Sequence, residues 1–383
     1  MENRGEDRIR LVSMVEAETV TGPMKPLLMF TRHVHGPGID SITVSHSAVT
    51  TVRTSGQKPL GRNAFLRAAD DAGLPIDLLR ERFLFDWSIL SQLAECLADR
   101  KPDVVETHDV KSHFIMWLLK MYGRIQGARW AAFHHGYTRT SARVFMYQQL
   151  DRISLRAADR VVTVCEPFVH QLVRRGVNPS KITILKNAVE ERARPTDFEL
   201  QCLRRRLGLQ TADRIILSVG RLSPEKGHKT LIAAYRQLRL IVGMQDLRLV
   251  LVGDGGHAKV LKSAAADLGS EVLFVGHVED PWPFYCLADV FVLPSHSEGS
   301  PLALFEAMSA ALPIIASAVG GVPETLCNGV SAVLVSAGSE PALARALEHV
   351  LSDAKFADSI RRGARAAVEE CSPVRYIGQR LRH

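Results

Sequence analysis

Short apolar segments alternate with longer segments of helical spacing from about residue 100 to the end of the chain. The apolar segments are typical of buried strands, and the segments between them are long enough for helices. Residues 102–107 and then 112–121 form one such strand and helix, and residues 160–164 and then 166–175 form another. This alternation predicts an α/β protein in which helices connect parallel strands.

The alternation occurs in two series separated by a polar stretch at 190–197, the expected linker. The other expected strands are 128–133 and 182–185 in the first series, and 215–219, 247–252, 272–275, 290–293 and 314–316 in the second. We therefore expect two doubly wound, Rossmann-like domains, residues 1–195 and residues 196–371. Ligands of such sheets bind at the carboxyl ends of the strands, so the expected site lies in a cleft that the two domains face.

The first 60 residues are less regular. Leu27–Phe30 has the apolar character of a short strand, and residues 42–52 alternate apolar and polar side chains as a second strand would. A helix at 64–72 and a strand at 74–79 are expected after them. The sequence contains no internal repeat and no low-complexity tract.

Length and composition fit this organisation. The chain has 383 residues, of which 46% are hydrophobic, enough for two ordinary domains with cores of their own. The six cysteines are scattered without a Cys-x-x-Cys pair, which favours a reducing, cytoplasmic location over a disulfide framework or a zinc site. The N-terminal residues lack the apolar core of a signal peptide, and the apolar stretches are too short to span a bilayer.

The charge is unevenly distributed. Residues 1–195 contain 28 Lys and Arg against 21 Asp and Glu, whereas residues 196–383 contain 20 of each. One interpretation is a solvated basic surface; the other is attraction to an anionic partner, either the surface of a membrane or a phosphorylated acceptor. The basic residues are not interleaved with aromatic ones, so nucleic acid is not an expected partner.

Two acids, Glu298 and Glu306, are the first candidates for function. Glu298 lies in the loop after the strand at 290–293, and Glu306 lies in the apolar helical segment that follows. Ser300 is a good N-cap and Pro301 suits the first helical position. The unpaired N–H groups of that first turn would favour a negatively charged ligand, and carboxylates bind hydroxyls. This combination is suited to a nucleotide sugar.

The second half resembles the retaining glycosyltransferases of family 4, which have the GT-B fold. The resemblance is based on five segments between residues 214 and 326, in the order of the family: Ser218–Gly227, Leu251–Gly255, Phe274–Val278, Leu293–Met308 with its Glu-x7-Glu signature, and Gly320–Glu324. The set is specific, although each segment alone would be weak. The tight turn at Gly253–Gly256 is explained equally well by chain reversal or by a ligand.

The resemblance implies the roles of several side chains. Glu298 would contact the donor sugar, Glu306 would hold the ribose hydroxyls, and Arg221 and Lys226 would bind the diphosphate. The donor pocket would also include Gly220, Val278, Gly299, Ser300 and Leu302. The chemistry agrees, because fixed cations stabilise the charge that grows on a leaving nucleoside diphosphate. The chain contains no Asp-x-Asp pair; we therefore expect no essential metal and no cofactor other than the nucleotide-sugar co-substrate.

The first half resembles the family more weakly. Residues 102–109 resemble a strand that ends in a histidine near the cleft, here His108, and Phe133–Gly136 resembles the His-Gly step that holds the donor sugar and leaving phosphate. His135 is the expected catalytic histidine and His134 the alternative. Each could instead be structural, and Asp109 could be only a helix N-cap. The resemblance also implies that residues 372–383 cross back to the first domain.

The opening departs from the family pattern of a strand, a Gly-Gly loop and a long helix. His35–Gly38 is the glycine-rich candidate, and the expected strand at 42–52 follows it directly. The resemblance implies transfer of a sugar, with UDP-sugar as the expected donor, to an acceptor hydroxyl with retention of configuration. Bacterial relatives build cell-surface polysaccharides on lipid-linked acceptors, which fits a cytoplasmic protein at the inner face of the membrane. The irregular opening leaves a catalytically silent nucleotide-sugar-binding subunit as the alternative, and a sugar-nucleotide epimerase as a weaker one.

Overall fold

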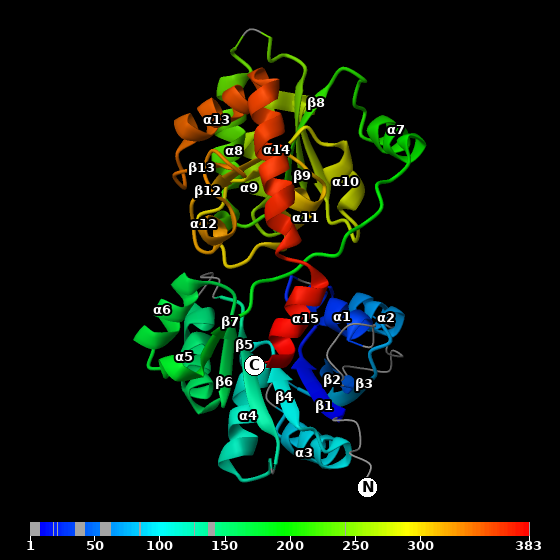
Figure 1. Ribbon diagram of the computed structural model, residues 1–383, viewed down its shortest axis with the longest axis vertical. Helices are drawn as coiled ribbons and strands as arrows, with labels where there is room; N and C mark the ends of the chain where they lie inside the picture. The colour runs from blue at the N-terminus through cyan, green and yellow to red at the C-terminus, as the bar shows by residue number, and fades with distance from the viewer. Residues whose placement is uncertain are drawn as a thin grey trace, which may run out of the picture. The chain divides into compact units, whose positions relative to one another are not determined.

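The computed structural model describes the chain apart from residues 1–7, 18, 21, 35–42, 54–62, 84–85, 126, 137–141, 242 and 383, and apart from the side chains of residues 142–148 and 382. The chain divides by its contacts into two units (Figure 1). One unit comprises Met1–Lys186 and Pro373–His383, and the other comprises Asn187–Ser372. The division falls before the polar stretch 190–197, which therefore belongs to the second unit.

The first unit contains one seven-stranded sheet. Its elements in chain order are β1 (Arg8–Val15), α1 (Met24–His33), β2 (Thr43–Arg53), α2 (Ala64–Asp71), β3 (Ile76–Glu81), α3 (Ser88–Arg100), β4 (Val104–Thr107), α4 (Val110–Met121), β5 (Arg129–His134), α5 (Ala142–Ala157), β6 (Arg160–Thr163), α6 (Glu166–Arg174), η1 (Pro179–Lys181), β7 (Ile182–Ile184) and α15 (Pro373–Arg382). The strand order is β3-β2-β1-β4-β5-β6-β7, and neighbouring strands are parallel.

Helices cover both faces of this sheet. Side chains of α3 and α4 pack with alternate residues of the central strands, among them Val12, Val105 and Trp130, in one buried cluster. Side chains of α1 and α2 form a second cluster with Val15 and Ala48. The terminal helix α15 contacts α1, so the last residues of the chain belong to the same unit as its beginning. Met14 and Val15 of β1, and Ala48 and Val49 of β2, are divided between the two clusters, as a sheet buried on both faces requires.

The opening of the chain corrects part of the sequence analysis. Leu27–Phe30 is not a strand but the middle of α1, and all four side chains are buried. An apolar run of four residues has no period that separates a strand from a buried helix. The expected strand at 42–52 is confirmed as β2, and β1 precedes α1 in the order β1, α1, β2. The first βαβ unit is therefore present rather than shortened; His35–Gly38 lies outside the described residues.

The second unit contains a six-stranded parallel sheet. Its elements in chain order are α7 (Asp197–Arg206), β8 (Arg214–Val219), η2 (Pro224–Lys226), α8 (His228–Leu238), β9 (Leu247–Val252), α9 (Ala258–Ala264), η3 (Ala266–Glu271), β10 (Val272–Gly276), α10 (Trp282–Leu287), β11 (Val290–Leu293), α11 (Leu302–Ser309), β12 (Ile314–Ser317), α12 (Val322–Thr325), β13 (Val333–Val335), α13 (Glu340–Ser352) and α14 (Ala354–Glu369). The strand order is β10-β9-β8-β11-β12-β13.

Two buried clusters sandwich this sheet as well. On one face, α10, α11 and α14 pack on Ile215 and Leu217 of β8; on the other, α8 and α13 pack on Ile216. Both sheets reverse their strand order once, between β1 and β4 and between β8 and β11. Two doubly wound α/β units of this kind confirm the predicted fold class, and such a reversal is where these folds bind ligands.

Candidate active site

The two predicted donor-site residues Lys226 and Glu298 meet at the strand-order reversal of the second sheet. Lys226 ends η2, in the loop that follows β8, and Glu298 lies in the loop that follows β11. The lysine Nζ is 2.7 Å from Oε1 and 2.9 Å from Oε2 of the glutamate. The side chain of Glu298 is 5% exposed and that of Lys226 is 26% exposed. The pair therefore places a buried carboxylate and a more accessible ammonium at the expected ligand crevice.

The loop that carries Glu298 is tightly held. The Ser295 hydroxyl donates to Glu298 Oε1 at 2.6 Å. Gly320 has a φ of +55°, and a Cβ there would overlap the carbonyl oxygen of Glu298. A side chain at residue 320 would thus displace the loop, so Gly320 is needed for both its backbone angle and its close approach.

The loops after β8 and β11 are also fixed to each other. The Ser223 hydroxyl donates to Glu225 at 2.7 Å, and the Glu225 carbonyl accepts from the His296 N–H at 2.8 Å. Gly227 has a φ of +67° and lies against the Pro294 carbonyl, where a Cβ would overlap it. These contacts preorganise Lys226 and Glu298, because each loop determines the position of the other.

Arg221 lies in the same loop but is exposed. Two glycines of the turn after β9 support the backbone on either side of it: a Cβ at Gly253 would overlap the Gly220 carbonyl, and a Cβ at Gly255 would overlap the Leu222 carbonyl. Chain packing is therefore a sufficient reason for glycine at Gly253 and Gly255. Their effect on the site is indirect, since they position the segment that carries Arg221.

Glu306, the second acid of the signature, is half-buried on α11. Its Oε2 accepts a hydrogen bond of 3.0 Å from the hydroxyl of Tyr285. Burial, together with the Glu306 carboxylate, raises the pKa of Tyr285 well above its usual value. Tyr285 thus remains a hydrogen-bond donor that orients Glu306, and sequence analysis did not identify it because a tyrosine among apolar residues resembles an ordinary core residue.

The start of α11 differs from the sequence prediction. Ser300 is not the N-cap: its hydroxyl accepts from the Asn187 N–H at 3.1 Å, and its carbonyl accepts from the Asn187 side chain at 2.7 Å. Pro301 has an extended backbone, and the helix begins at Leu302 without a side-chain cap. Ser300 therefore holds the segment at Asn187 against the loop that carries Glu298. Gly299, Leu302 and Val278 are only partly buried.

In the first unit, the predicted histidines His108 and His135 lie together. They follow β4 and β5, two neighbouring strands, and His135 Nε2 is 3.5 Å from His108 Nδ1. Their rings are stacked with centroids 5.8 Å apart. Burial lowers the pKa of both imidazoles below the usual value, although Glu106 partly opposes this at His108. Both rings are therefore neutral near pH 7.

The alternative candidate His134 has a different environment. It is buried, and its Nδ1 lies 3.9 Å from Asp151, which also pairs with His113 at 2.6 Å. Burial lowers the pKa of His134 to about 4, and the neighbouring carboxylate only partly offsets this effect. His134 therefore belongs to the packing between β5, α4 and α5. Asp109 is confirmed as a helix N-cap, in a capping box with Ser112.

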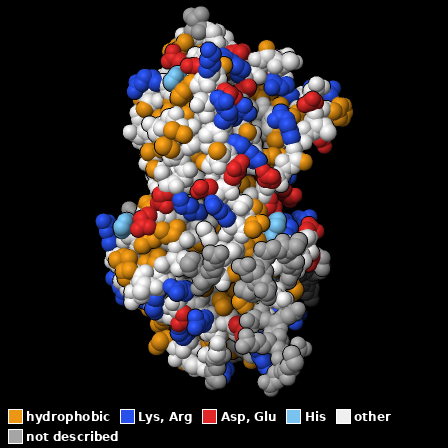
Figure 2. All heavy atoms as spheres, viewed as in Figure 1, with side chains coloured by type: hydrophobic (Ala, Val, Ile, Leu, Met, Phe, Trp, Pro, Cys, Tyr) orange, Lys and Arg blue, Asp and Glu red, His pale blue; other side chains and the backbone are white. Residues whose placement is uncertain are grey.

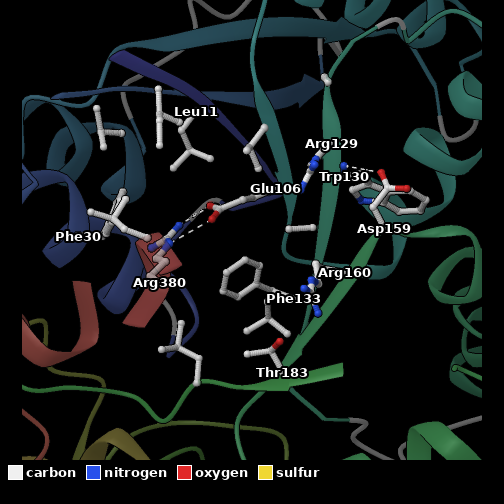
Figure 3. A pocket seen from close by; sticks show the side chains of 18 of the residues that line it. Leu11, Phe30, Glu106, Arg129, Trp130, Phe133, Asp159, Arg160, Thr183 and Arg380 are labelled. Carbon is white, nitrogen blue, oxygen red and sulfur yellow. Dashed lines mark hydrogen bonds and ion pairs between the residues drawn. The ribbon is translucent and has the colours of Figure 1, made fainter. Parts of the chain in front are cut away.

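A cavity of about 720 Å³ in the first unit lies beside the β4 and β5 strands and is lined by none of the predicted site residues (Figure 3). Its lining does include a buried ion pair, Glu106 with Arg380, that sequence analysis missed. The available signal was a charged residue, Glu106, in an apolar strand, since buried charges are rare unless paired. Nothing in the local sequence indicated that Arg380 would be its partner.

Three further observations concern surface charge, membrane-spanning helices and metal-ligating groups. On the face drawn in Figure 2, the described Lys and Arg side chains are interspersed with Asp and Glu rather than gathered in one basic patch. Within the part of the chain that the structure describes, no helix is both long and apolar enough to cross a membrane. No group of three His, Cys, Asp or Glu among the described residues is arranged to hold a metal ion.

The two doubly wound α/β units can be compared with known proteins. Residues 201–367 match the family described as glycosyl transferases group 1, and residues 43–188 match the glycosyl transferase 4-like domain. Together these matches support a GT-B glycosyltransferase with a 4-like first domain.

Individual relatives point to the same class. An uncharacterized glycosyltransferase of Methanocaldococcus jannaschii is 27% identical over 70% of this chain and 71% of its own length. D-inositol 3-phosphate glycosyltransferase of Acidothermus cellulolyticus is 32% identical over 66% of this chain, and the aligned region spans 61% of that relative. The crystal structure of Anabaena HepE in complex with UDP-glucose has the same fold, with a TM-score of 0.80, 18% identity and 98% of each chain covered.

Proposed function

We propose that this protein transfers a sugar from a nucleoside-diphosphate sugar, with UDP as the nucleotide, to an acceptor hydroxyl with retention of anomeric configuration. The observation that carries the proposal is the Lys226–Glu298 pair at the strand-order reversal of the second sheet. The likeness in fold to a protein solved with UDP-glucose supports the choice of donor. The presence of β1, α1 and β2 at the opening supports the transferase over the silent subunit that the sequence left as the alternative.

In this proposal the second unit binds the donor. Glu298 accepts from the sugar hydroxyls, and Glu306, oriented by Tyr285, accepts from the ribose hydroxyls. Arg221 and Lys226 neutralise the diphosphate, where negative charge grows as the bond to the sugar breaks. Lys226 Nζ contacts both carboxylate oxygens of Glu298. In this proposal the lysine is shared between that carboxylate and a phosphate oxygen of the donor.

In the transfer step, the bond between the anomeric carbon and the leaving phosphate oxygen breaks, and the acceptor oxygen bonds to that carbon from the same face. The acceptor proton passes to the leaving phosphate. His135 would hydrogen-bond the donor sugar or the leaving phosphate, as neutral imidazole can. Since protein cations meet the phosphate charge, we infer that the reaction needs no metal ion and no resident cofactor.

We further infer that the acceptor belongs to cell-surface polysaccharide or glycolipid biosynthesis at the inner face of the membrane. The support is the excess of Lys and Arg in residues 1–195. A basic protein surface binds anionic lipid, and the binding weakens as salt rises. Sedimentation with vesicles that contain phosphatidylglycerol tests this point, and equal binding to neutral vesicles would contradict it.

The experiment for the donor is a panel of UDP-, GDP- and ADP-sugars, with binding measured by calorimetry and transfer measured as acceptor-dependent nucleotide release in EDTA. We expect UDP-sugars to bind and to be consumed. If no donor binds, the proposal is wrong. If a donor binds but no plausible acceptor gives turnover, the protein is a nucleotide-sugar-binding subunit. Loss of turnover in EDTA that returns with Mg²⁺ would contradict metal independence.

Variants locate the activity. Glu298→Ala should weaken donor binding and abolish transfer, whereas His135→Ala should lower kcat by about 100-fold or more with a smaller effect on binding. The controls are Glu369→Ala and His170→Ala, which alter exposed side chains of α14 and α6. Normal transfer by both site variants would show that catalysis takes place elsewhere.

A further inference from the structure

Glu106 and Arg380 form a buried ion pair that joins the middle of the first sheet to the last helix. Glu106 lies on β4 and Arg380 on α15, and they are 4% and 9% exposed. The Arg380 Nε donates to Oε1 at 3.1 Å, and its Nη2 donates to Oε2. The guanidinium lies over the ring of Phe30, 4.0 Å from its centroid, and faces Phe133 from 5.3 Å (Figure 3).

Such a pair is not explained by stability alone. Two buried charges lose the free energy of their hydration, and their mutual attraction often does not compensate for this loss. Apolar residues of similar volume commonly stabilise a fold as well or better. Burial raises the pKa of Glu106, but Arg380 and His108 outweigh that effect, and the net pKa lies well below the usual range. Glu106 is therefore a permanent carboxylate in the interior.

The remaining neighbours of this carboxylate lead toward the predicted catalytic histidine. Glu106 Oε2 accepts from the Ser13 hydroxyl at 2.8 Å and lies 3.5 Å from His108 Nε2. That nitrogen is buried and has no closer hydrogen-bond partner among the described residues. Hydrogen bonds of catalytic groups are often long before substrate binds and shorten afterwards. The carboxylate is thus the acceptor available to an Nε2 proton of His108.

The other side of His108 faces His135. The His108 ring is stacked on Phe133, with centroids 4.5 Å apart, and its Nδ1 is 3.5 Å from His135 Nε2. A neutral imidazole with its proton on Nε2 has an acceptor at Nδ1. The hydrogen bond that one ring nitrogen makes determines which nitrogen carries the proton. A carboxylate at His108 Nε2 therefore makes Nδ1 the acceptor for an Nε2 proton of His135.

We propose that Glu106, held by Arg380, is a positioning residue that fixes the tautomer of His108 and, through it, the tautomer and orientation of His135. This inference rests on the proposed role of His135 in sugar transfer. Neither Glu106 nor Arg380 contacts the reacting atoms. Arg380 brings α15 into this arrangement, so the last helix of the chain supports the histidine that follows β5.

The first test uses nitrogen-15 NMR of the histidine rings in the full-length protein, because ring shifts distinguish the two neutral tautomers. We expect His108, assigned by comparison with His108→Asn, to carry its proton on Nε2. Glu106→Gln should reverse this, since an amide nitrogen can donate to Nε2 and leave the proton on Nδ1. Wild-type His108 with its proton on Nδ1, or an unchanged spectrum in Glu106→Gln, would overturn the proposal whether or not the protein transfers sugar.

The second test is kinetic. Glu106→Gln should lower kcat by about 10- to 100-fold with little change in the KM for donor, as loss of a group that orients a histidine typically does. Glu106→Asp and Arg380→Lys should retain intermediate kcat and the wild-type tautomer. The control is Glu81→Gln in the same unit. Glu81 is also a buried carboxylate, and its Oε2 pairs with Lys111 Nζ at 2.9 Å.

Glu81→Gln should lose thermal stability without loss of kcat. If Glu106→Gln loses only stability, as the control does, the pair is structural and the inference is wrong. If Glu106→Gln does not fold, Arg380→Lys and Glu106→Asp decide, and a wild-type kcat in both overturns the proposal. A wild-type protein that transfers no sugar contradicts the proposed function instead, and this outcome is recognised before any variant is made.

Discussion

Substitution of Gly320 by alanine tests whether the close contact beneath Glu298 organises the donor site. Gly320 has a φ of +55°, and an added Cβ would overlap the Glu298 carbonyl oxygen. Gly329 is the matched control: it lies in the same unit with a φ of +74°, and a Cβ there meets nothing within 4 Å. Both variants place alanine in the left-handed region, but only one of them crowds the donor loop.

The expected losses of stability follow from the backbone strain and the steric overlap. The backbone strain of alanine at positive φ is about 1 kcal/mol in each variant. The overlap in Gly320→Ala adds about 2 kcal/mol, the typical cost of overpacking a site that has to move. For a unit of this size, about 3 °C of melting temperature is lost per kcal/mol. We therefore expect the second unit to melt about 9 °C lower in Gly320→Ala and about 3 °C lower in Gly329→Ala.

Calorimetry of the full chain measures both decreases in melting temperature. The transition of the second unit is the one whose melting temperature falls in Gly329→Ala. Displacement of the loop should also move Glu298 from its position beside Lys226, so UDP-sugar affinity should fall about 10-fold or more in Gly320→Ala and stay unchanged in Gly329→Ala. Affinity for UDP alone should change less, because UDP lacks the sugar. Equal melting temperatures and equal donor affinities in the two variants would refute the argument.

Three further predictions concern other parts of the chain. Burial, with Lys226 as a second cause, lowers the pKa of His228 to about 4. Below pH 6.5 the unfolded chain therefore binds more protons than the folded chain, and the second unit should lose about 3 kcal/mol of stability between pH 6.5 and pH 4. Urea titrations should show a smaller loss in His228→Asn. Asp109→Ala removes the capping box with Ser112 and should destabilise the first unit by about 1 kcal/mol, whereas Asp109→Asn should cost less; equal stability of all three proteins would contradict the cap. Tyr285→Phe should weaken UDP binding several-fold at nearly constant stability, because Glu306 loses the hydroxyl that orients it, and unchanged UDP affinity would show that the contact is not used.

The order of strands and helices from residue 100 onward could be predicted from the sequence, because apolar runs bounded by turns carry that information locally. The same local pattern correctly gave β2 and the helix cap at Asp109. It failed at Leu27–Phe30, where a four-residue apolar run has no period to separate strand from helix. The predicted N-cap of α11 was also wrong, because the Ser300 hydroxyl binds Asn187 rather than the first turn of the helix. This hydrogen bond joins residues that are distant in the chain, so the local sequence does not indicate it.

The candidate site also has a part that the sequence predicts and a part that it does not. The sequence by itself determined which residues are candidates for a donor site, since Lys226, Glu298 and Glu306 belong to short motifs in the loops after strands and in the helix that follows. Only the tertiary structure decided their partners: Lys226 beside Glu298, Tyr285 under Glu306, and Arg380 on Glu106 across 274 positions of sequence. The physical reason is that a motif is set by neighbours along the chain, whereas the partner of a buried charge is set by packing between elements, which no local pattern records.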